Sequence, residues 1–104
     1  MAAIAVSQWK VHPGKAQEFI ALIKEVNQVG ANHGLTGRLF LSVLAGPNVG
    51  TYSHAWEAAD LATLATGLQN RAADPAYPSL QDRLFGADGV ATLLSHAQAT
   101  EIPL

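Results

Sequence analysis

The sequence contains no cysteine among its 104 residues. Disulfides, thiolate catalysis and cysteine-ligated metals are therefore excluded, and the default expectation for such a chain is a cytoplasmic protein. No apolar run reaches the roughly 18 residues that a membrane-spanning helix needs. The N-terminus, Met1-Ala-Ala-Ile4, also lacks the basic segment of a secretory signal. We expect neither a membrane partner nor secretion.

Charge is also scarce: charged residues make up 13% of the chain, about half of their usual share, and hydrophobic residues make up 49%. The six basic residues form no patch and the net charge is −2, so nucleic acid is not an expected partner. A monomer would have little charge to cover its surface, which favours a homodimer. Alternatively, the many alanines raise the hydrophobic count without any self-association.

Alternation of side chains predicts a strand from Ala3 to Val11, followed by a break at Pro13 and Gly14. Apolar residues at helical spacing predict an amphipathic helix from Lys15 to Val29, ended by Gly30 or Gly34. Alternation returns in residues 35–44 and 51–57, and the turn-forming residues 45–50 between them predict a hairpin.

A second helix is predicted from Leu61, with Asp60 as its N-cap and Leu61, Leu64, Ala65 and Leu68 on its apolar face. The pair Asp74-Pro75 should interrupt it, because the residue before proline disfavours helical geometry. A further turn or two should run through Leu80, Leu84 and Phe85, before a last strand over residues 90–100.

The order of elements, βαββαβ, is that of a ferredoxin-like α+β fold forming one domain over residues 1–104. Its four-stranded antiparallel sheet has the spatial order four, one, three, two, with both helices on one face. The other face is left open and partly apolar, and a second copy of the chain is the simplest cover for it.

The third predicted strand places Tyr52, His54 and Trp56 on one face, because side chains alternate along an extended chain. If Ser7 and Trp9 of the central first strand share that face, the helix-covered side holds a pocket suited to a flat aromatic ligand. The alternative is an ordinary packed interior, in which the aromatic rings are buried and their polar atoms find local partners.

The remaining histidines give little support for a metal site. His96 of the last strand could join the pocket, but a strand separates it from His54, so the two lie roughly 9 to 10 Å apart. No carboxylate at ligand spacing accompanies them, and we predict no metal. His12 and His33 fall in a loop and at a helix end, where solvation or capping is the ordinary role.

Three segments resemble the dimeric α/β-barrel superfamily, which includes the antibiotic biosynthesis monooxygenases and NIPSNAP-like proteins. They are Trp9-Lys-Val-His-Pro-Gly-Lys15 before a helix, Tyr52-Ser-His-Ala-Trp-Glu57 before another, and Asp74-Pro-Ala-Tyr77. The resemblance covers nearly the whole chain. It implies a homodimer whose two sheets pack into a barrel, with any active site between each sheet and its own helices.

The resemblance further implies a monooxygenase-like activity without metal or prosthetic group, in which a small aromatic substrate reacts with oxygen after deprotonation. This substrate would be a phenol or hydroquinone, or a polyketide-like compound. Under this hypothesis His54 is the general base, since an imidazole titrates near neutral pH. Tyr52 and Trp56 orient the ring, Ser7 donates a hydrogen bond to the developing oxyanion, Trp9 excludes water, and His96 completes the substrate site.

The sequence also departs from members of this superfamily. Heme-degrading relatives carry an asparagine where Ser7 stands and a histidine on the second helix, whereas residues 61–85 contain no histidine; heme is therefore not an expected cofactor. The last strand lacks the arginine that some oxygenase members use to hold an anionic intermediate. A non-catalytic ligand-binding module and a purely structural dimerisation module stay open as alternatives, and a fully packed interior beside Trp56 would favour the latter.

Overall fold

The computed structural model describes residues 2–43 and 50–104. Its strands are β1 (Ala3–Val11), β2 (Thr36–Leu41), β3 (Tyr52–Ala58) and β4 (Ala91–Thr100). Its helices are α1 (Ala16–Ala31), α2 (Leu61–Ala73) and α3 (Tyr77–Phe85). The predicted order of elements is confirmed, with the second helical segment divided in two. The predicted hairpin turn lies outside the described residues, except for Gly50.

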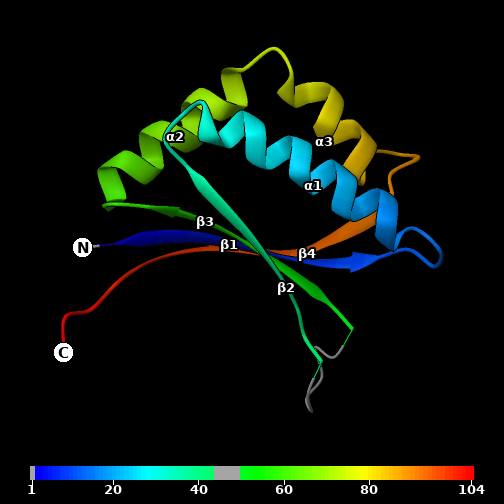
Figure 1. Ribbon diagram of the computed structural model, residues 1–104, viewed down its shortest axis with the longest axis horizontal. Helices are drawn as coiled ribbons and strands as arrows, with labels where there is room; N and C mark the ends of the chain where they lie inside the picture. Colours follow the sequence, from blue (N-terminus) through cyan, green and yellow to red (C-terminus); the bar gives the residue numbers. More distant parts are fainter. Residues whose placement is uncertain (1, 44–49) are drawn as a thin grey trace.

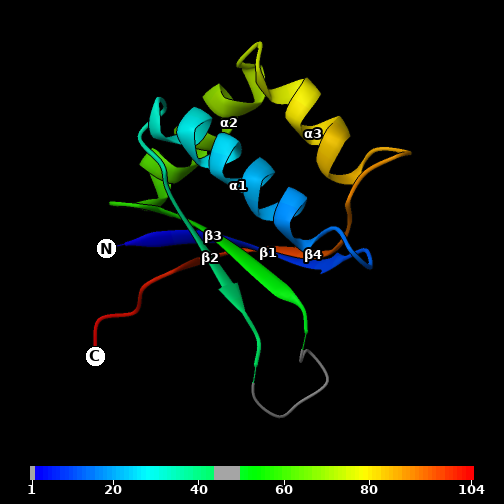
Figure 2. The same ribbon diagram turned by 45° about the vertical axis from the view of Figure 1, so that its right-hand side comes forward.

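The strands form one antiparallel sheet in the order β2-β3-β1-β4, which is the predicted order in reverse. All three helices lie on one side of this sheet and leave its other side bare (Figure 1). The view turned by 45° shows the same two layers (Figure 2). None of the helices in the described part of the chain is long and apolar enough to cross a membrane.

The strand register decides which side chains face the helices. Ser7 of β1 stands opposite His54 on β3 and opposite His96 on β4, so these three side chains form one row across the sheet. Trp56 faces the same side, because it pairs with Ala5, two residues before Ser7. The shared face predicted for the first and third strands is therefore present.

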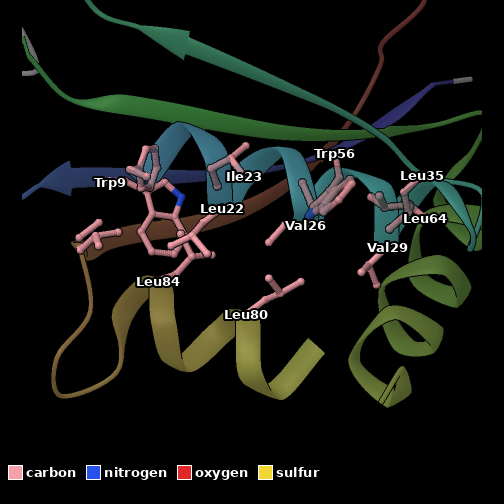
Figure 3. Packing of buried hydrophobic residues seen from close by; sticks show 14 of the residues in the cluster. Trp9, Leu22, Ile23, Val26, Val29, Leu35, Trp56, Leu64, Leu80 and Leu84 are labelled. Carbon is pink, nitrogen blue, oxygen red and sulfur yellow. The ribbon is translucent and has the colours of Figure 1, made fainter. Parts of the chain in front are cut away.

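The hydrophobic core fills the space between the sheet and the helices. Trp9 packs beside Leu22 and Leu84 at one place, and Trp56 beside Val26 at another (Figure 3). Helix α1 contributes most of the helical share, with the buried residues Phe19, Leu22, Ile23, Val26, Val29 and Gly30. The two indoles thus lie in separate parts of one core.

The predicted apolar face of α2 was partly wrong. Leu64 is fully buried and Leu68 partly so, but Ala65 is exposed and Leu61 is 49% exposed. Leu61 is the first residue of the helix, where the chain has just left the sheet. Gly67 takes the inward position instead.

The predicted helix boundaries have clear local causes. The Asp60 carboxylate accepts a hydrogen bond from the Thr63 backbone N–H at 2.7 Å, which confirms it as the N-cap of α2. Asp74 has extended backbone angles before Pro75, so the helix ends where predicted. After α1, Gly34 takes the left-handed conformation with φ of 79°, whereas Gly30 lies inside the helix, contrary to one of the two alternatives.

Candidate functional site

A cavity of about 150 Å³ lies between the helices and the helix-facing side of the sheet. Every helix and three of the strands contribute to its wall. Its chemically distinctive lining residues are Ser7, Trp9, His54, Trp56, Arg71, Tyr77, Gln81 and His96. Five of the six residues predicted for the site therefore border one space, and this space lies beside Trp56.

His54 is the buried imidazole of this cavity, with only 3% of its surface exposed. Its Nε2 lies 2.7 Å from Oδ1 of Asn27 on α1. Since an amide oxygen only accepts, Nε2 is the donor, and in the neutral ring Nδ1 carries the lone pair. Within the described residues, Nδ1 makes no hydrogen bond to the protein. The fixed tautomer leaves one basic nitrogen for a ligand.

The surroundings of His54 disfavour its protonated form. Burial, and then the positive charge of Arg71, lower the pKa of His54 to about 4. The imidazole is therefore neutral at physiological pH. Its lone pair can accept a proton, but the imidazolium is stable at this pH only if a negatively charged ligand offsets the positive charge of Arg71.

Trp56 forms the apolar wall next to His54. The two rings meet edge to face, with 4.7 Å between their centroids and an interplanar angle of 80°. On its other side the indole presses against Gly30 of α1, where a Cβ atom would overlap Cζ3 and Cη2 of the ring. The absence of a side chain at Gly30 therefore allows the Trp56 indole to lie this close to α1.

Arg71 of α2 brings a positive charge to the cavity. Its guanidinium carbon lies 4.5 Å from the centre of the Tyr77 ring and 5.6 Å from that of Trp56. Burial lowers the pKa of Arg71, and Tyr77 acts in the opposite direction. The guanidinium nevertheless stays charged, because the ordinary pKa of arginine is far above neutral.

Ser7, Trp9 and His96 line the side of the cavity nearest to β4. The indole N–H of Trp9 donates to Oγ of Ser7 at 2.8 Å, which leaves the serine hydroxyl hydrogen free to donate in turn. His96 is exposed on the edge strand β4 although it belongs to the row of Ser7 and His54. It therefore stands at the open side of the cavity.

Tyr52, the sixth residue predicted for the site, lies elsewhere, and so do the two histidines for which only solvation or capping was expected. Tyr52 faces the helices but packs on Phe19, with 5.2 Å between ring centroids, and does not line the cavity. His12 contacts the carbonyl of Gly89 and the hydroxyl of Thr92. His33 pairs with Asp74 at 2.9 Å. Both histidines hold local structure together.

Within residues 2–43 and 50–104, no three histidine or carboxylate side chains gather as ligands for a metal ion. His54 and His96 both line the cavity, but Ser7 stands between them in the row across the sheet.

Asn27 and Arg71 are functional candidates that the sequence interpretation missed. Each stands at helical spacing from buried residues: Asn27 follows Ile23 by four positions, and Arg71 follows Leu64 by seven. A polar residue in register with an apolar face was the available signal. The same holds for Gln81, which lies three positions before the buried Leu84.

No protein-family model and no curated protein sequence matches this chain. Solved structures do match it over nearly its whole length. SnoaB, described as a cofactor-independent oxygenase from Streptomyces nogalater, is matched in a mutant form with a TM-score of 0.71 and 16% identity, over 99% of this chain and 95% of that one.

Two further similar structures come from other sources. A NIPSNAP family protein from Agrobacterium tumefaciens has a TM-score of 0.69 and 18% identity, over 100% of this chain and 94% of that one. A conserved protein from Methanosarcina mazei has a TM-score of 0.71 and 14% identity, over 98% and 94%. The chain thus has the ferredoxin-like fold that SnoaB and NIPSNAP proteins share, as the resemblance predicted.

Proposed function

We propose that this protein is a cofactor-independent oxygenase that acts on a small phenol or hydroquinone in the cavity beside Trp56. The observation that carries the proposal is the hydrogen bond from Nε2 of His54 to Asn27, because it leaves Nδ1 of a cavity-lining imidazole without a protein partner among the described residues. The fold shared with SnoaB, a cofactor-independent oxygenase, supports the same class of reaction. Fold alone does not determine chemistry, so the local geometry carries more weight.

His54 is the proposed general base. It accepts the phenolic proton on Nδ1, and the carbonyl oxygen of Asn27 stabilises the resulting cation through the existing bond to Nε2. Arg71 lies near enough to lower the pKa of His54 and also offsets the negative charge of the phenolate. Arg71 by itself weakens His54 as a base, but a phenolate bound beside both groups would be attracted to the guanidinium and to the imidazolium, which offsets the lowered pKa of His54.

The ionised ring supplies all the electrons for the proposed reaction. A phenol with a free para position loses its hydroxyl hydrogen and its para hydrogen, while O₂ takes four electrons. One oxygen atom becomes the second carbonyl of a quinone, and the other leaves as water with the two hydrogens. No external reductant is needed.

The other predicted residues bind substrate in this proposal. Trp56 lies along the ring, the hydroxyl of Ser7 donates to the oxyanion, Trp9 closes the apolar end, and His96 stands at the entrance. Tyr52 acts only through Phe19, on which it packs.

The test is oxygen uptake and quinone formation with a panel of single-ring phenols and hydroquinones. His54→Gln should lower kcat/KM by about 10²-fold or more if His54 is the base, while circular dichroism shows a folded protein. His12→Gln is the matched control, because His12 is exposed and does not line the cavity. Equal turnover by wild type and His54→Gln would contradict the proposal.

A non-catalytic small-ligand-binding protein is the second candidate. The cavity favours it over a purely structural dimerisation module, since a fully packed interior was the expectation for that role. Ligand binding that depends on Trp56, without oxygen uptake for any substrate in the panel, would support this candidate.

A homodimer is the proposed state of the protein, with the bare side of the sheet as its interface. The strand register puts Phe40, which is 54% exposed, on that side. The same side carries small or apolar residues of the other strands, namely Ile4, Val6, Ala55, Ala97 and Ala99. Burying an aromatic side chain among them would stabilise association.

The proposed location, the cytoplasm, still rests on the cysteine-free sequence.

Light scattering after size exclusion tests the dimer. Phe40→Glu should yield monomers, because it puts a charge into the apolar interface. Ile20→Glu is the control, since Ile20 is exposed on the helical layer. A monomeric wild type would contradict the proposed state.

A further inference from the structure

Arg71 is a cation that has no carboxylate partner in the described part of the chain. The other two arginines each pair with a glutamate. Arg38 lies 3.5 Å from Glu57, and Arg83 lies 3.6 Å from Glu25. Both of those pairs are at the surface. Arg71 makes no ion pair within residues 2–43 and 50–104, although it is the arginine that lines the cavity.

The hydrogen-bonding groups of Arg71 are also unused. Its Nε is buried and has no acceptor, and no hydrogen bond joins its guanidinium to any other described residue. Buried polar groups are normally satisfied, so an orphan of this kind calls for an explanation. Tyr77 and Trp56 contribute ring faces next to the guanidinium. A ring face can stack on the guanidinium plane, but it does not accept hydrogen bonds from the N–H groups at the edge of that plane.

A carboxylate is the group that best matches this arrangement. The guanidinium presents its N–H donors in one plane, and a carboxylate offers two acceptor oxygens in one plane, so the two pair side by side. A ring attached to that carboxylate would extend along Trp56, which borders the same space.

The size of the cavity limits the ring system. A cavity of roughly 150 Å³ in another protein holds a single benzene molecule, and the cavity here has about the same volume. Most ligand pockets are larger, at roughly 300 to 1,000 Å³. One ring fits, with a small substituent directed toward the open side at His96.

We propose that the cavity binds a single-ring aromatic carboxylate, whose permanent negative charge pairs with Arg71 while its ring lies against Trp56. The inference rests on the proposed function in that it places its ligand in the same pocket. It specifies the substrate class further, because it requires a charge present before any deprotonation at His54.

The experiment compares two probes of nearly the same shape, 3-hydroxybenzoate and 3-hydroxybenzamide; the first carries a negative charge and two acceptor oxygens, and the second is neutral, with one acceptor oxygen and an NH₂ donor. Their dissociation constants are measured by NMR titration under nitrogen, so that no turnover intervenes. Wild type should bind the benzoate about tenfold or more tightly than the benzamide, as expected for a charge-assisted hydrogen bond. Arg71→Gln should lose this preference, because the benzoate loses a charge-assisted pair and the benzamide loses at most an ordinary hydrogen bond.

Two further variants make the test specific. Arg83→Gln should keep the full preference, because Arg83 lies outside the cavity wall and pairs with Glu25. Arg71→Lys keeps the charge without the planar fork and should keep only part of the preference. It also provides a second measurement if Arg71→Gln is poorly folded.

The proposal is overturned by equal affinity of wild type for the two probes, by a preference that survives in Arg71→Gln, or by failure of both probes to bind at millimolar concentration. These outcomes are independent of catalysis. If the protein binds the benzoate selectively but consumes no oxygen, the oxygenase proposal alone is wrong. If it consumes oxygen only with neutral phenols, the carboxylate proposal alone is wrong.

Discussion

The imidazole of His54 donates from Nε2 to the side-chain oxygen of Asn27 at 2.7 Å, across the boundary between the sheet and α1. The bond fixes which nitrogen carries the proton. Because Asn27 is neutral, it orients the imidazole without adding a negative charge that would favour the imidazolium. The chemistry of the site therefore depends on one residue of the helical layer.

Replacing Asn27 with aspartate should raise the pKa of His54 from about 4 by roughly 1 to 3 units, because a carboxylate on Nε2 favours the charged ring. The pKa is measured by NMR from the pH dependence of the His54 ring signals. Asn32→Asp is the control, since Asn32 is exposed at the end of α1. An unchanged pKa in Asn27→Asp would show that the bond does not form in solution.

Stability should fall as the pH is lowered from about 6.5 toward 4. The pKa of His54 is about 4 in the folded protein and about 6.5 in the unfolded chain, so the unfolded state binds more protons in this window. Each unit is worth about 1.4 kcal/mol, which makes the full effect about 3 kcal/mol.

Urea denaturation at a series of pH values measures this effect. His54→Gln should flatten the dependence between pH 6.5 and 4.5, whereas the exposed His12→Gln should retain it. The carboxylates with lowered pKa values, Asp60 and Asp74, lose their contributions only as the pH falls below about 4. A slope that persists in His54→Gln would assign the effect to other groups.

The order of elements and the shared face of β1 and β3 were predictable because alternation is strong in half-covered strands. Ala5 and Trp9 face the core, and so do His54 and Trp56. Once the topology puts β1 between β3 and β4, only a shift by one residue could separate these side chains. Most of the pocket wall contributed by the sheet was therefore predicted from the sequence, on the condition that the strands share this register, whereas Tyr52 was predicted there and packs on Phe19 instead.

The helical half of the site was not predictable in the same way. Asn27 and Arg71 stand in register with buried apolar residues, but both are residue types that usually face solvent, so their residue type assigns them to the outside. Their inward placement depends on how α1 and α2 lie over β3, which local periodicity does not determine. Leu61 shows the opposite error, since an apolar residue at a helix start need not reach the core.

Gly30→Ala tests how tightly α1 lies on the pocket wall. The added methyl group would overlap the benzo ring of Trp56, so either the indole or the helix must move. We expect a loss of about 1 to 3 kcal/mol in the free energy of unfolding, although alanine is the better helix former by about 1 kcal/mol.

Trp56→Phe removes the overlapping atoms, and in that background Gly30→Ala should cost much less. Denaturant unfolding of the four proteins gives the coupling free energy between the two sites. Because the same indole lines the cavity, a cost that is identical in both backgrounds would mean that Gly30 does not set the depth of the pocket.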